Sequence, residues 1–373
     1  MIKQYPFYLK STVVIFGLTL FVYALLNLRD ILVPISFAVL LAILLNPFIN
    51  LLQRWHVPKV VAILIAILFA FILIGSIIYF ISIEMSSFTD KMPLLKNKFS
   101  QLASKVQHAI ATEFNIPVKK QQQYIDEAGS SMKPLIGATV GTLMGTFALI
   151  FLLPVYTFLF VYYKVLILNF LYESFAENNS KEVSIVLKQG KAAIQSYMFG
   201  LLLEALIVAI LNSTALLLLG VDYAILIGLI GALLNILPYI GGIIAIFLPV
   251  FIATITKDGY NTQIAIVGAY VIIQFIDNHF LVPYIVSSKV KINALISIII
   301  VLLGGAVWGV SGMFLSIPFI GILKIIFDRV PDLKHWGKLL GDEVPTKHKG
   351  QIWNSRRKPK KEVVAEPLNA TAA

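Results

Sequence analysis

The sequence contains no cysteine and few charged residues. The absence of Cys among its 373 residues excludes disulfide bonds, thiolate metal sites and catalysis by a cysteine nucleophile. Only 13% of the residues are charged, whereas a soluble globular domain has about 25%. Acids are the scarcer class, since 19 Asp and Glu stand against 30 Lys and Arg. This composition excludes an ordinary soluble enzyme.

Long hydrophobic runs are abundant, and 58% of the residues are hydrophobic. A run of about 20 apolar residues is long enough to cross the hydrocarbon core of a bilayer as a helix. The runs are apolar on all sides and do not alternate as the strands of a barrel would. They predict an all-α, polytopic helical membrane protein. The eight predicted apolar blocks are residues 11–28, 31–52, 60–83, 135–163, 197–219, 223–256, 262–282 and 295–327.

The basic residues beside these blocks predict the orientation of the chain. Lys and Arg favour the cytoplasmic side of short loops, and they cluster before residue 11, between residues 54 and 59, within 164–196 and in the tail. Both termini are therefore expected in the cytoplasm of a bacterial cell, with the chain crossing the inner membrane several times. Four regions follow. Residues 1–83 hold the first three transmembrane helices, and 84–133 form an extracytoplasmic helical segment. Residues 134–330 form a C-terminal transmembrane bundle with a cytoplasmic helical loop at 164–196, and 331–373 form a basic, largely disordered cytoplasmic tail.

Two regions outside the blocks predict contacts with partners. In 84–133 an apolar seam of helical spacing runs through Leu95, Phe99, Leu102, Val106 and Ala109. It packs either on the protein's own outer face or membrane interface, or against another subunit. The tail segment 346–361 has seven Lys and Arg and no acid, which is typical of an orientation signal in contact with anionic lipid. Because no folded nucleic-acid-binding domain surrounds this segment, no nucleic acid is expected as a partner.

Two blocks are interrupted by helix breakers. The block 223–256 has its break around Asn235, Pro238, Tyr239, Gly241 and Gly242, and the block 295–327 has its break around Gly304, Gly305, Gly309, Gly312 and Pro318. At 1.5 Å per residue a helix of 34 residues would be about 50 Å long, beyond a core of about 30 Å. Each block is expected to be kinked or, preferably, folded back as a hairpin. The backbone groups freed by a break need protein or a water-filled cavity, so the breaks indicate a pathway, although small residues can also form a packing notch.

Ionisable groups inside these blocks are rare and are costly in lipid. Glu204 lies in the run LLLEAL and Asp277 in QFIDNH. Each is a possible coupling carboxylate for a proton or cation. Glu204 can equally be a protonated acid that is hydrogen-bonded to a neighbouring helix. Asp277 can equally be an N-cap or an ion-pair partner of Lys289. The predicted transport pathway consists of Asn235, Pro238, Tyr239, Gly241, Gly242, Gln274, Asp277, Asn278, Pro283, Gly309, Gly312 and Pro318.

The sequence carries no motif for catalysis or for cofactor binding. There is no HExxH pair, no GxSxG elbow and no Walker-type phosphate loop, so neither an enzyme nor an ATP-driven pump is expected. His279 has no second histidine at metal-ligand spacing. We predict no metal, no cofactor and no catalytic residue.

The run from Gly228 to Gly242, GLIGALLNILPYIGG, resembles the signature of the AI-2E family of bacterial membrane proteins, which are autoinducer-2 exporter-like and PerM-type permeases. The resemblance continues through QFIDNHFLVP from Gln274 to Pro283 and then through Gly304, Gly309, Gly312 and Pro318. It covers about residues 10–330. It implies a homo-oligomeric inner-membrane transporter, with some relatives associated with autoinducer-2 export and others with sodium/proton antiport.

The chain departs from the family pattern at two breaks and keeps an acid at a third position. Gly242 and Ala294 stand where the family often has proline, which changes the stiffness of each break but not the fold. Asp277 stands where the family often has glutamate.

Three functions are consistent with the sequence. In order of preference they are the export of a small polar solute or signalling molecule along the broken helices, Na⁺(Li⁺)/H⁺ antiport through Glu204 or Asp277, and a scaffold without transport. The expected partners are the lipid bilayer, a small polar solute or monovalent cation, and other copies of the chain.

Overall fold

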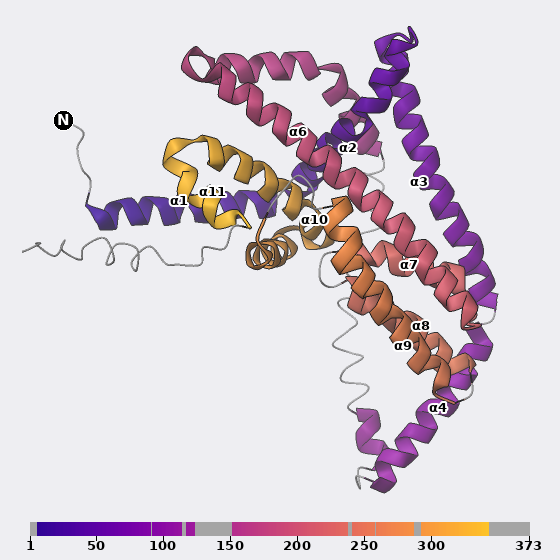
Figure 1. The fold of residues 1–373 in the computed structure, drawn as a ribbon. Helices are drawn as coiled ribbons and strands as arrows, with labels where there is room; N and C mark the ends of the chain where they lie inside the picture. Colours follow the sequence, from indigo (N-terminus) through magenta and orange to yellow (C-terminus); the bar gives the residue numbers. More distant parts are fainter. Residues whose placement is uncertain are drawn as a thin grey trace, which may run out of the picture.

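The structure is a computed structural model, and it describes residues 6–90, 92–113, 117–123, 151–237, 241–257, 259–286 and 292–342. Within these ranges the chain is helical and has no strand, so the predicted all-α membrane fold is confirmed. Figure 1 shows the arrangement. The helices are α1 (Phe7–Asn27), α2 (Arg29–Arg54), α3 (Lys59–Asp90), α4 (Met92–Glu113), the segment Phe151–Tyr162, α6 (Lys164–Leu218), α7 (Ala224–Asn235), α8 (Gly241–Thr256), α9 (Asn261–Ile276), the π-helix η1 (Asp277–Val286), α10 (Ala294–Arg329), the 3₁₀ turn η2 (Pro331–Leu333) and α11 (Lys334–Leu340).

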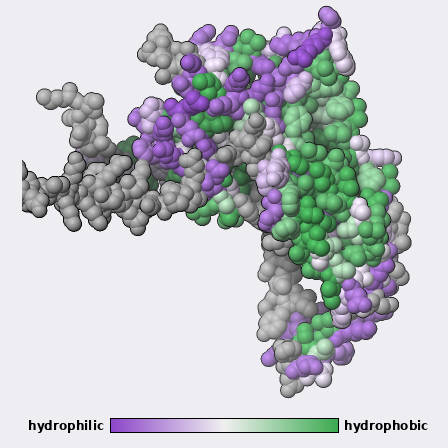
Figure 2. Space-filling view, viewed as in Figure 1, coloured by the Kyte–Doolittle hydropathy of each residue, from purple (hydrophilic) through white to green (hydrophobic). Residues whose placement is uncertain are grey.

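Among the described residues, five helices are long and apolar enough to cross a membrane, or six if the bent pair formed by Phe151–Tyr162 and Lys164–Phe175 is one span. Their outer faces expose large hydrophobic side chains along α3, α6 and α9. Figure 2 shows this surface as a hydrophobic band between two hydrophilic ends. Such a band is the surface that lipid acyl chains cover in a polytopic protein.

The block 223–256 folds back as the pair α7 and α8. Gly231 faces Ala245 across the pair, with 3.5 Å between the position of a Cβ on the glycine and the Ala245 Cβ, and Gly242 lies beside the Asn235 amide. These contacts pair the last part of α7 with the first part of α8, so the two helices run antiparallel as a hairpin. At 12 and 16 residues, its arms are about 18 and 24 Å long, so neither crosses a core of about 30 Å.

The block 295–327 also folds back, within α10. Trp308 and Gly309 leave helical geometry, and Gly309 has φ +61°, a conformation suited to glycine. Beyond this turn the Ser316 Oγ donates to the carbonyl of Ile300 at 3.0 Å. The second arm therefore lies on the first.

Helix α6 is the central element of the bundle, with α7, η1, α9, α10 and α2 packed on it. Residues spaced by three or four positions along it are buried, which places one face of the helix against its neighbours. In Figure 1 α6 changes direction after its first part. The buried face consists of Tyr197, Leu201, Glu204, Val208, Asn212 and Leu216.

The two predicted extramembrane regions lie at opposite ends of the molecule, with α4 at one end and the first part of α6 at the other (Figure 1). This is the arrangement expected if they lie on opposite sides of a membrane. Of the seam in α4, Val106 and Ala109 are exposed, whereas the side chains of Leu95, Phe99 and Leu102 lie outside the described residues. The basic segment 346–361 also lies outside them.

Candidate functional site

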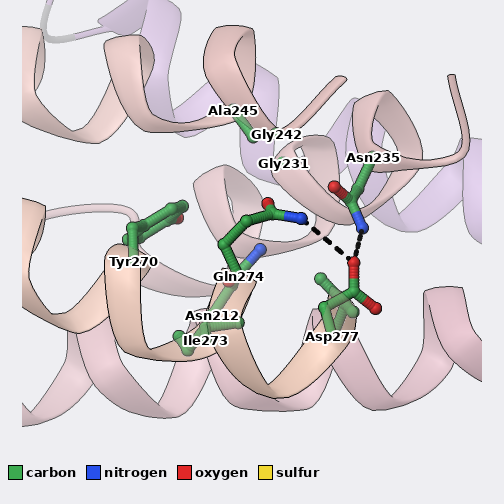
Figure 3. A pocket seen from close by; sticks show the side chains of 10 residues that line it. Asn212, Gly231, Asn235, Gly242, Ala245, Tyr270, Ile273, Gln274 and Asp277 are labelled. Carbon is green, nitrogen blue, oxygen red and sulfur yellow. Dashed lines mark hydrogen bonds between the residues drawn. The ribbon is translucent and has the colours of Figure 1, made fainter. Parts of the chain in front are cut away.

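Asp277 is the centre of a polar cluster inside the bundle. It is 3% exposed, and it is the first residue of η1, at the point where α9 changes to a π-helix. Its Oδ2 accepts hydrogen bonds from the Asn235 Nδ2 at 2.9 Å and from the Gln274 Nε2 at 3.2 Å. Figure 3 shows both bonds converging on one oxygen. The cluster thus joins the end of α7, next to the break, to the end of α9.

Glu204 is the second acid of this cluster. It projects from the buried face of α6, is 5% exposed, and its carboxyl lies close enough to that of Asp277 for the two groups to interact electrostatically. Two neighbouring carboxylates repel each other, so a proton or a cation bound between them lowers the electrostatic cost of the pair. Two acids that sequence reasoning treated separately therefore form one unit.

A small cavity of about 10 Å³ adjoins the Asp277 carboxyl. Its volume corresponds to roughly one water molecule. Figure 3 shows the polar side chains around it, which come from α6, α7 and α9. The lining residues are Val208, Asn212, Gly231, Asn235, Gly242, Ala245, Tyr270, Ile273, Gln274 and Asp277.

Several oxygens of the cluster are buried without a hydrogen-bond partner among the described residues. They are the Asp277 Oδ1, the Glu204 Oε2, the Asn212 Oδ1 and the Tyr270 hydroxyl oxygen. A buried polar group without a partner costs about 1–3 kcal/mol. Three of these groups, on Asp277, Asn212 and Tyr270, belong to residues that line the cavity.

Two glycines of the hairpin let the backbone approach these side chains. A Cβ at Gly242 would lie 2.9 Å from the Gln274 Cδ and 3.3 Å from the Asn235 Oδ1, and a Cβ at Gly231 would lie 3.3 Å from the Asn212 Nδ2. A side chain at Gly242 would therefore displace the Gln274 amide. Gly231 and Gly242 therefore leave room for the polar side chains of the cluster.

Chemically, the cluster can hold a proton or a small cation with oxygen ligands. Carboxylate, amide carbonyl and hydroxyl oxygens are the ligands that hard cations prefer. Among the described residues, no group of three His, Asp or Glu could hold a metal ion. The ligands offered are carboxyl, amide and hydroxyl oxygens, a set that suits a hard cation better than a soft transition-metal ion.

The structure brings together part of the predicted pathway. Asn235, Gly242, Gln274 and Asp277 line the cavity, and Glu204 contacts it through Asp277. Gly241 packs against the end of α7, with its Cβ position 2.7 Å from the Asn235 Cα.

The other predicted residues lie away from this cavity or outside the described residues. Asn278 accepts a 3.4 Å hydrogen bond from Gln274 but is exposed, and Pro283 is exposed further along η1. Gly309, Gly312 and Pro318 belong to the α10 hairpin, which contributes no lining residue. Pro238 and Tyr239 lie outside the described residues.

The pathway predicted from the sequence omits two polar residues that line the cavity. Asn212 lies eight residues after Glu204, and Tyr270 lies seven residues before Asp277. Spacings of seven and eight residues return to the same helical face. Asn212 and Tyr270 could therefore have been predicted from the positions of Glu204 and Asp277.

Comparison with known proteins points to a family of transporters. The model of the family described as AI-2E family transporter matches residues 11–332. The chain is 24% identical over 321 residues to the AI-2 transport protein TqsA of Escherichia coli strain K12, covering 84% of this chain and 90% of that protein. It is 25% identical over 316 residues to PerM of the same strain, which is named as a permease, covering 81% of this chain and 88% of PerM. It is 21% identical over 310 residues to YrrI of Bacillus subtilis strain 168, which is named as a transport protein, covering 81% and 87%.

Proposed function

Because the chain belongs to the AI-2E transporter family, we propose that it is a secondary transporter that exchanges protons for a monovalent cation at the Glu204–Asp277 carboxyl pair. The observation that carries the proposal is the proximity of two buried, interacting acids beside a cavity with unpartnered oxygens. Intramembrane acids that face a partner or a cavity are typical of proton and ion pathways.

The exchange balances in charge. With one proton shared between the carboxyls, the pair has a charge of −1. When Na⁺ or Li⁺ binds and the proton leaves, two carboxylates and one cation again give −1. The same site therefore holds either ion at equal net charge, so one H⁺ exchanges for one cation. Equal charge matters because a change of net charge in lipid is expensive.

The size of the cavity supports a small cargo. About 10 Å³ accommodates roughly one water-sized particle, which is comparable to a dehydrated monovalent cation. Asn212, Asn235 and Tyr270 supply neutral oxygens around it. This is why we place antiport ahead of solute export, although the sequence alone favoured the reverse order.

The test is proton movement in proteoliposomes that contain the full-length chain. After a pH gradient is imposed, a pulse of Na⁺ or Li⁺ should dissipate it, as followed with a pH-sensitive dye. Glu204→Gln and Asp277→Asn should each abolish the response, because each replaces a carboxyl with an amide of similar size. Asp30→Asn is the matched control, since the Asp30 side chain is 88% exposed, and it should respond like the wild type. A response that survives both substitutions would disprove the assignment.

Export of a small polar solute or signalling molecule is the second candidate. It is supported by the printed name of TqsA, an AI-2 transport protein, which is 24% identical to this chain. An organic solute needs more room than this cavity has, so the α7–α8 hairpin would move away from α9 to open the pathway. Export of labelled solute driven by a pH gradient, and lost in Asp277→Asn, would support this candidate over cation exchange.

For the remaining properties we propose an inner-membrane location with both termini in the cytoplasm and a homo-oligomeric assembly. The orientation rests on the distribution of Lys and Arg, and the separation of α4 from the first part of α6 fits it. A scaffold without transport, the third alternative, would have no use for two buried acids.

A further inference from the structure

A second cluster of charged side chains lies where the segment Phe151–Tyr162 meets α6. The two helices are bent by 62° at this junction. The Lys164 Nζ donates to the Asn46 Oδ1 at 2.9 Å, and the Lys59 Nζ donates to the carbonyl of Tyr162 at 2.8 Å. Lys191 also acts electrostatically on Lys164. Lys59 of α3 and Lys164 and Lys191 of α6 thus bring their ammonium groups to one region, beside Asn46 of α2.

This cluster lacks a neutralising acid. Within the described ranges, no carboxylate forms an ion pair with Lys59, Lys164 or Lys191. The charges that act on Lys164 are those of the other two lysines, and both repel it. Like charges held together in a folded chain favour the binding of an anion.

Packing holds the cluster in position. Asn46 is 6% exposed, and its amide oxygen is the acceptor for Lys164. Its Nδ2 has no acceptor among the described residues, so one end of this amide orients the lysine while the other remains a possible donor. Gln195, one turn beyond Lys191, donates to the carbonyl of Ile43 at 2.8 Å and fixes α6 on α2.

Exposed aromatic residues place the cluster at the level of the lipid headgroups. Trp55 is 66% exposed, and Tyr162 and Tyr163 are 40% and 46% exposed. Trp55 lies between the end of α2 and the start of α3, two helices long enough to span a membrane. Trp and Tyr are enriched at membrane–water interfaces, and the Lys59 Nζ lies 5.2 Å from the centroid of the Tyr162 ring.

We propose that Lys59, Lys164 and Lys191 form a binding site for the phosphate group of an anionic phospholipid. The acyl chains of that lipid would lie along the exposed apolar surface of α3, and the phosphate would meet the ammonium groups at the junction. Basic pockets between transmembrane helices bind such headgroups in general. This site is separate from the basic tail, and it shares no residue with the transport site.

The experiment compares lipid binding by the full-length protein and by variants in native mass spectrometry. The affinity for the first bound phosphatidylglycerol is measured, with phosphatidylcholine as the zwitterionic control. The test variant is Lys164→Gln/Lys191→Gln, because Lys59 also satisfies a backbone carbonyl at the bend and could be needed for folding. The matched control is Lys181→Gln/Lys334→Gln, which removes the same charge from two exposed lysines.

The affinity for phosphatidylglycerol should fall about fivefold for each lysine removed from the site, with no such fall in the control variant. Equal affinities in the two double variants would overturn the proposal. A second arm separates the sources of phosphate by titrating inorganic phosphate and following the melting temperature. The lipid would be excluded as the occupant if free phosphate stabilised the wild type but not the test variant, while both bound phosphatidylglycerol with the same affinity. If both variants melt like the wild type, a loss of lipid binding cannot be attributed to unfolding.

Discussion

Gly242→Ala should impair transport without unfolding the protein. A Cβ at this position would lie 2.9 Å from the Gln274 Cδ and even closer to its amide oxygen. Because the obstacle is the end of a flexible side chain, the new methyl group can be accommodated by a rotation of Gln274. That rotation breaks the 3.2 Å hydrogen bond from the Gln274 Nε2 to the Asp277 Oδ2.

The size of the effect follows from the lost bond. A hydrogen bond to a charged group contributes about 1.5–3 kcal/mol. If the bond orients the carboxylate for its ion, its loss weakens ion binding roughly 10- to 150-fold. The apparent affinity for Na⁺ or Li⁺ in the proteoliposome assay should therefore fall by at least about tenfold, while the melting temperature of the protein stays close to that of the wild type.

Two comparisons isolate the cause. Gly268→Ala is the matched control on α9, since a Cβ there meets nothing within 4 Å, and it should transport normally. The second is a double-mutant cycle with Gln274→Ala. If Gly242→Ala acts by displacing the glutamine, adding it to Gln274→Ala should have little further effect, so the two losses should be strongly non-additive.

Wild-type ion affinity in Gly242→Ala would refute this reasoning, because the geometry leaves no room for both the methyl group and the Gln274 amide. Fully additive losses in the cycle would show that Gly242 acts through the backbone of the hairpin.

Three further predictions concern the packing of the helices. Gly304→Ala should open the α10 hairpin, since its Cβ would lie 2.5 Å from the carbonyl oxygen of Gly312 on the opposite arm. An overpacked contact costs about 1–3 kcal/mol, which thermal unfolding in detergent would detect. Trp308→Phe keeps an aromatic ring but removes the 2.9 Å hydrogen bond to a carbonyl of α1, so hydrogen exchange at the end of α1 should accelerate about fivefold, for a loss of about 1 kcal/mol. Glu182→Gln removes a 3.5 Å ion pair between half-exposed side chains of α6 and α10, and the stability should change by less than about 1 kcal/mol; a larger loss in denaturant unfolding would contradict this.

The sequence was sufficient to predict the class of fold and the positions at which helices break. Hydrophobic runs of membrane length need helices, because every backbone group in lipid must be satisfied within the segment. The blocks around Asn235 and Gly309 are too long for a single crossing, and both fold back. The same reasoning identified Glu204 and Asp277, since an acid inside an apolar run is rare enough to stand out.

Residue spacing alone could not pair these acids. Glu204 and Asp277 are 73 positions apart in the chain, and nothing in the periodicity of α6 or α9 says that these faces meet. The sequence also suggested that the two broken blocks line one pathway. In the structure the α7–α8 hairpin reaches the acids, whereas the α10 hairpin packs on α1, α2, α6 and the C-terminal helix.

The sequence by itself determined that this chain is a helical membrane protein with two interrupted blocks, because hydrophobic length and helix breakers act locally along the chain. Only the tertiary structure decided which polar groups share a site. The unpartnered oxygens around the cavity, the joining of Glu204 to Asp277, and the convergence of Lys59, Lys164 and Lys191 all come from side chains on different helices. Their distances are set by helix packing, which no local pattern of residues encodes.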